Sequence, residues 1–267
     1  MEVMGGWAVS YQSMRPRPSL RQLLQVLCVS WLAGCASHTY KPIEPDWQGR
    51  VAELLEAWPV STYTVLDRGQ PVGRMTLRQS LQEEAGERFV LMEDAARVVD
   101  PTGEAELVDY AFISRCRLDD HFTPQVVEGQ LPARTDTPAN SRVEISEGWA
   151  RGTTFESEVD LQVPERFLIR QGLMRLAGLL PREVGSETQL TFLSLGAHPA
   201  VEKGRSVRCS GCEELEIEGQ RVKAWRFEYE TAERGKLRSV SLWVGEEGRL
   251  LRFHDEQGLQ LELRRML

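Results

Sequence analysis

Apolar and polar residues alternate with a period of two in many short runs, and this alternation constrains the fold more than any other feature. Trp225, Phe227 and Tyr229, for example, alternate with charged residues. This is the spacing of a β-strand with one buried face and one solvated face. Turn residues such as Ala85-Gly86 and Glu246-Glu247-Gly248 separate neighbouring runs, as in hairpins. The sequence therefore predicts a mainly β fold, an antiparallel meander with one apolar face.

Two segments have helical spacing instead. Apolar residues of the segment 51–58 recur at i, i+3, i+4 and i+7, which predicts a short N-terminal helix that Pro59 ends. The segment from Pro164 to Leu180 predicts a longer amphipathic helix with a wide apolar face. Because the sheet must bury its apolar face, we expect it to curl into a half-barrel or open barrel, with this helix covering the open side.

An apolar run from Leu23 to Gly34 precedes the predicted domain. It has about twelve residues, where a membrane-spanning helix needs roughly twenty. Arg15, Arg17 and Arg21 lie just upstream, as in the basic region of a secretory signal, and Met14 is a plausible start. The alternatives for this run are a buried helix and a plain signal peptide.

The run ends in Leu32-Ala33-Gly34-Cys35, which resembles the lipobox of bacterial lipoproteins. The resemblance implies that residues 1–34 are removed as a signal peptide. Cys35 then becomes an N-terminus that carries fatty acyl chains such as palmitate and binds the lipid bilayer. Ala36, in place of the Asp associated with inner-membrane retention, favours the outer membrane facing the periplasm where the cell has one.

After the lipidation site, residues 35–48 contain two prolines and no apolar periodicity, so we expect a tether. Residues 49–267 are then expected to form a single β-rich domain. The whole chain has a net charge of −8, and the signal segment carries three Arg and one Glu, so the mature chain carries −10. An exported acidic protein is a poor partner for nucleic acid, which we therefore exclude.

Three cysteines remain in the predicted domain: Cys116, Cys209 and Cys212. Cys209 and Cys212 form a CxxC motif, for which we consider a structural disulfide, idle thiols, a metal site and a redox pair. A zinc site needs four ligands, and no second CxxC or His pair is present. The turn-like Ser-Gly between the two cysteines favours the disulfide.

The sequence names no catalytic residue. GxSxG, HExxH, P-loop and GxGxxG motifs in a suitable context are absent, so we expect neither an enzyme nor a cofactor. Aromatic residues and Met line adaptable apolar pockets. The candidates to line a ligand cavity are Phe167, Met174, Trp225, Phe227 and Tyr229. The alternative for these five residues is an ordinary filled core.

The expected arrangement is similar to that of the half-barrel periplasmic proteins of the lipoprotein-carrier class, in which helices close a curved sheet around an apolar cavity. We therefore expect a membrane-anchored, non-enzymatic scaffold or binding module for a protein partner or an apolar ligand. The alternative function is a periplasmic thiol, redox or metal-dependent protein that uses Cys209 and Cys212.

Overall fold

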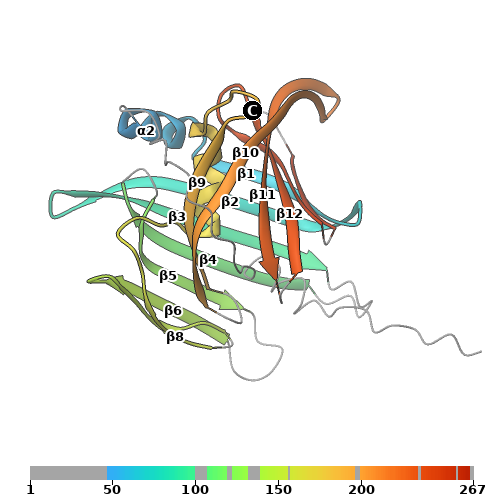
Figure 1. The fold of residues 1–267 in the computed structure, drawn as a ribbon. Coiled ribbons are helices and arrows are strands. Elements are labelled where there is room, and N and C mark those ends of the chain that lie inside the picture. Colours follow the sequence, from blue (N-terminus) through green and yellow to red (C-terminus); the bar gives the residue numbers. More distant parts are fainter. Residues whose placement is uncertain are drawn as a thin grey trace, which may run out of the picture.

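The structure is a computed structural model of the 267-residue chain (Figure 1). It describes residues 47–99, 107–118, 122–131, 139–155, 157–195, 199–233, 236–256 and 258–264. The expected signal peptide, Cys35 and most of the tether lie outside the described residues. No helix in these ranges is both long and apolar enough to cross a bilayer.

The chain forms two α-helices, one 3-10 helix and fourteen strands in the described ranges. In chain order they are α2 (Trp47–Ala57), β1 (Val60–Asp67), β2 (Gln70–Glu84), β3 (Glu87–Val99), β4 (Leu107–Arg117), β5 (Pro124–Leu131), β6 (Ala139–Ser146), β7 (Trp149–Thr153), β8 (Glu158–Gln162), α3 (Arg170–Leu176), η1 (Ala177–Leu179), β9 (Glu187–Ser194), β10 (Ala200–Ile217), β11 (Gln220–Glu233), β12 (Lys236–Gly245), β13 (Leu250–Asp255) and β14 (Leu259–Leu263).

The fourteen strands form one antiparallel sheet with two sequential halves. Strands β1 to β8 follow one another across the first half, and β9 to β14 follow one another across the second. The halves join where β1 pairs with β14, with Tyr63 opposite Leu263. In Figure 1 the strands of the two halves run in different directions. This confirms the predicted mainly β, antiparallel meander, curled but not closed into a barrel.

The free edges of the sheet are β8 and β9, and the segment between them lies at the open side. Leu168 forms a parallel bridge with Phe192 of β9. A small apolar cluster joins side chains of β5 to β8 to this segment and to β9; its buried members are Val127, Val143, Ala150, Val159, Val163, Phe167, Ile169 and Leu193. Side-chain packing thus links the two edges without a continuous hydrogen-bond ladder.

The prediction of a helix from Pro164 to Leu180 is wrong for its first six residues. The α-helix spans only Arg170–Leu176 and continues as the 3-10 turn Ala177–Leu179. Upstream, the Leu168 N–H donates to the Thr191 carbonyl at 2.9 Å, and the Leu193 N–H donates to the Leu168 carbonyl at 2.9 Å. These hydrogen bonds hold the backbone extended against the β9 edge, and tertiary pairing therefore overrides the local helical pattern.

The short N-terminal helix is confirmed as α2. It begins at Trp47, two residues before the expected start of the domain at residue 49. Val51, Leu54 and Leu55 are buried against the main core. That core fills the concave side of the sheet, and Tyr63, Phe227 and Phe253 are among its largest fully buried side chains.

Candidate functional site

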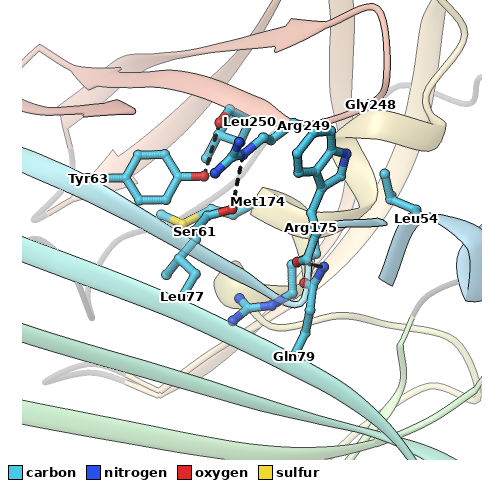
Figure 2. A pocket seen from close by; sticks show the side chains of 11 residues that line it. Leu54, Ser61, Tyr63, Leu77, Gln79, Met174, Arg175, Gly248, Arg249 and Leu250 are labelled. Carbon is cyan, nitrogen blue, oxygen red and sulfur yellow. Dashed lines mark hydrogen bonds between the residues drawn. The ribbon is translucent and has the colours of Figure 1, made fainter. Parts of the chain in front are cut away.

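A small polar pocket interrupts the apolar interior near the junction of the two half-sheets. It has a volume of about 30 Å³, which holds about two water molecules. Figure 2 shows the hydroxyl groups of Ser61 and Tyr63 and the guanidinium of Arg249 pointing toward one another in it. The lining residues come from α2, β1, β2, α3 and the β12–β13 turn: Leu54, Trp58, Ser61, Tyr63, Leu77, Gln79, Met174, Arg175, Gly248, Arg249 and Leu250.

Arg249 is the least satisfied polar group of this pocket. Its residue surface is only 8 % exposed. Its Nε donates to Ser61 Oγ at 3.3 Å, and its guanidinium carbon lies 4.4 Å from the centre of the Trp58 ring. Its Nη1 is buried and has no hydrogen-bond acceptor in the described ranges of the chain. Burial lowers the pKa of Arg249, and the nearby Tyr63 and Glu247 oppose this shift.

Tyr63 supplies a neutral hydroxyl to the pocket. Its Oη donates to the Leu250 carbonyl at 3.0 Å. Burial raises the pKa of Tyr63 to about 12, although a hydrogen bond with Ser61 and the charge of Arg249 lower it in part. The phenol therefore stays protonated near neutral pH and does not compensate the charge of Arg249.

Arg175 contributes a second guanidinium, but its charge is already balanced. Its Nη2 donates to Asp94 Oδ1 at 2.7 Å, and both side chains are 3 % exposed. The same nitrogen donates to the Arg78 carbonyl at 3.0 Å. Burial raises the pKa of Asp94, and the charge and hydrogen bond of Arg175 offset part of that shift. The ion pair fastens α3 to β2 and β3.

An open groove of about 460 Å³ adjoins the polar pocket and shares Leu54 with it. It runs between α2, the η1–Pro181 segment and the β12–β13 turn. Arg182 lies in its wall, where the guanidinium donates to the Gly178 carbonyl at 3.0 Å and to the Glu246 carbonyl. The groove carries both signs of charge, from Arg50, Glu53, Arg182, Glu246 and Glu247.

The structure does not gather the five predicted cavity residues into one cavity. Met174 lines the polar pocket, whereas the other four line neither this pocket nor the groove. Phe227 and Tyr229 lie in the main core, and Trp225 packs against it half-buried. Phe167 belongs to the separate cluster at the sheet edges. Phe167, Phe227 and Tyr229 thus lie among packed core side chains, and the ligand cavity that they were expected to line stays a prediction.

The CxxC motif lies inside the long strand β10 and not in a turn. A β-bulge shifts the register between Cys209, which faces Phe227, and Gly211, which faces Arg226. Cys209 is a buried free thiol and Cys212 an exposed one, and Cys116 is buried. The expected Cys209–Cys212 disulfide is thus not formed in this structure. Burial also raises the pKa of Cys209, the opposite of what a nucleophilic thiol needs.

No cluster of three or more His, Cys, Asp or Glu side chains suited to a metal ion occurs among the residues that the structure describes. The sequence reasoning missed Asp94, Arg175 and Arg249. A signal for Asp94 was present, because it occupies the inward register of Met92 and Ala96 in β3. A charged residue in that register indicates a buried partner.

Comparison with known proteins leaves the family open. No family model matches the chain, and no curated protein matches it. Among solved structures, the chain is similar to one described as the crystal structure of a beta-barrel-like protein of domain of unknown function DUF1849 from Brucella abortus. The two sequences are 10% identical, the match covers 76% of this chain and 94% of that chain, and the TM-score is 0.48.

Proposed function

We propose that the mature chain is a lipid-anchored protein of the cell envelope, on the outer membrane where one exists, and that it acts as a binding module without catalytic activity. The lipobox-like ending at Cys35 supports the anchor. Twelve positions separate Cys35 from the start of α2. An extended tether of that length spans at most about 40 Å, which keeps the domain close to the bilayer.

The polar pocket carries the binding part of the proposal. A buried cation costs free energy unless a partner group compensates it, and Arg249 Nη1 has no hydrogen-bond partner among the residues that the structure describes. The groove beside the pocket is large enough for side chains of a second protein. Recognition of a polar group on a protein partner therefore fits these features better than storage of an apolar molecule among core side chains.

Metabolic labelling with an alkyne analogue of palmitate tests the anchor. We expect the wild-type protein to be labelled, to lose residues 1–34 and to fractionate with membranes. Cys35→Ala should be unlabelled and should retain the signal segment, because the lipidated thiol is missing. Cys28→Ser is the matched control and should behave as wild type. Labelling that persists in Cys35→Ala would exclude this anchor.

Site-specific photo-crosslinking in intact cells tests the binding role. A crosslinker at Glu53, which is exposed and lines the groove, should give one discrete adduct. The same crosslinker at Glu216, exposed on β10, is the control and should not. Arg249→Met should reduce the adduct at position 53. Equal adducts from both positions, or no effect of Arg249→Met, would argue against a binding surface here.

A further inference from the structure

Arg249 has no salt-bridge partner among the residues that the structure describes. The charge of Arg175 is paired with Asp94, and Tyr63 is a neutral donor to a backbone carbonyl. The carboxylate of Glu247 acts on Arg249 without forming a salt bridge. The buried guanidinium of Arg249 can therefore still form an ion pair with a ligand, and electrostatic interactions are strong in such a setting.

One hydrogen-bond donor is available for a ligand in this pocket. It is Arg249 Nη1, which has no acceptor among the residues that the structure describes. The Ser61 oxygen accepts from Arg249 Nε and its proton serves the hydrogen bond with Tyr63, so Ser61 orients the guanidinium. Ser61 is 7 % exposed and Arg249 is 8 % exposed, so more than nine-tenths of each residue is already removed from water. Packing around Ser61 and Arg249 therefore fixes the position of this donor before a ligand binds.

The pocket is small. A volume of about 30 Å³ accommodates about two water-sized groups, which suits a compact anionic group such as a carboxylate. Trp58 and Gln79 are the half-buried lining residues, so they mark the side from which a ligand can enter. Gln79 Nε2 donates a hydrogen bond to the Trp58 carbonyl at 2.9 Å.

We infer that this pocket is a carboxylate-binding site in which Arg249 Nη1 donates to a ligand oxygen and Ser61 orients the guanidinium. This inference rests on the proposed binding role and is independent of the lipid anchor. The carboxylate belongs either to a free small acid or to a polypeptide, as a chain terminus or an acidic side chain. Both sources present the same group to Arg249.

The test uses the full-length chain, purified in detergent and labelled with ¹⁵N-tryptophan, and acetate as the probe. Trp58 lies beneath Arg249, so its indole N–H should shift and saturate as acetate is added. Acetamide has nearly the same shape without the charge and should give no comparable shift. Trp243 is an internal control, since it lies beneath Arg252, which is already paired with Glu262.

Two variants test whether the change in the Trp58 signal comes from acetate bound in this pocket. Arg249→Met should weaken acetate binding about tenfold or more, the effect of losing a charge-assisted hydrogen bond. Arg252→Met is the matched control and should leave the acetate affinity at Trp58 unchanged. Equal shifts with acetate and acetamide, or an unchanged affinity in Arg249→Met, would overturn the inference. If Arg249→Met does not fold, the comparison of acetate with acetamide on the wild-type chain still decides.

A second binding experiment distinguishes a carboxylate on a polypeptide from a carboxylate on a free small acid. Acetyl-Gly-Gly with a free C-terminus is compared with its C-terminal amide. Stronger binding of the free acid than of acetate indicates a polypeptide terminus, whereas binding of acetate alone indicates a free small acid. Failure of all carboxylates together with positive crosslinking at Glu53 would refute the carboxylate site and retain the binding module.

Discussion

Arg175 and Asp94 form an ion pair in the interior of the fold. Both side chains are almost fully buried, and the pair connects α3 to β3 across the concave side of the sheet. Loss of one partner leaves the other charge buried and unpaired, which typically costs about 3–5 kcal/mol. A pair of apolar residues of similar size avoids that cost.

We therefore expect Arg175→Met to lower the free energy of unfolding by about 3 kcal/mol or more. The double variant Arg175→Met with Asp94→Leu should be more stable than the single variant, because no unpaired charge remains. Urea unfolding of the three proteins measures both differences. A double variant no more stable than Arg175→Met would contradict the cost assigned to the unpaired Asp94 carboxylate.

Glu202 in β10 predicts a pH dependence of stability. Its side chain is 1% exposed and lies 3.1 Å from Arg205 Nε. Burial raises the pKa of Glu202 from 4.5 to about 8, against the opposing effect of Arg205. The folded chain then keeps a proton that the unfolded chain releases. The contribution of Glu202 to the free energy of unfolding is full below pH 4.5 and is lost as the pH rises through about 8.

Glu202→Gln should remove this dependence, because the amide does not titrate. The difference in unfolding free energy between the variant and wild type should move in favour of the variant as the pH rises from 4.5 to 8. Glu216→Gln, an exposed change in the same strand, is the matched control for the substitution itself. A flat profile for Glu202→Gln would mean that Glu202 is ionised throughout this range.

At the scale of elements, a close backbone approach fixes η1 against the β12–β13 turn. A Cβ at Gly178 would come within 2.2 Å of the Gly248 carbonyl oxygen. Gly178→Ala should therefore destabilise the fold by about 1–3 kcal/mol and disturb the groove. Gly211→Ala is the matched control, since a Cβ there meets no atom within 4 Å. Thermal unfolding of both variants measures the contrast, and equal midpoints would contradict the packing described.

The bulge in β10 predicts unequal reactivity of the cysteines. Cys212 is exposed, whereas Cys209 and Cys116 are buried, and burial also raises the pKa of Cys209. In the folded protein a thiol reagent should label Cys212 quickly and the other two only upon unfolding. Peptide mapping identifies the labelled sites. Labelling of Cys212 that appears only after reduction would instead reveal the Cys209–Cys212 disulfide.

Local turns were predictable from the sequence, and contacts between distant segments were not. Ala85 and Gly86 both take positive φ angles, 53° and 82°, as their place between two alternating runs predicts. The extended segment around Leu168 was missed because a run of apolar residues fits a buried helix or an extended chain equally well. Its hydrogen bonds with Thr191 and Leu193 decide between the two. The CxxC motif was assigned to a turn for a similar reason, since Ser and Gly also occur in bulges.

For the whole molecule, alternation with a period of two was enough to predict a curled antiparallel meander. It did not predict that β14 returns to pair with β1 or that β8 and β9 become the edges, because pairing of distant strands leaves no local pattern. The polar pocket was unpredictable for the same reason. It combines Ser61, Arg175 and Arg249, which only the folded sheet brings together.

Native mass spectrometry tests directly whether core side chains fill the half-barrel. The sample is the polypeptide of residues 36–267, produced without the lipid and purified without denaturation. The main core and the cluster at the sheet edges contain four of the five residues expected to line a cavity, with Trp225 packed against the former. We therefore predict the mass of the polypeptide without any stoichiometric apolar molecule. A lipid or other apolar compound bound at one copy per chain would contradict a filled interior and would make the protein a carrier.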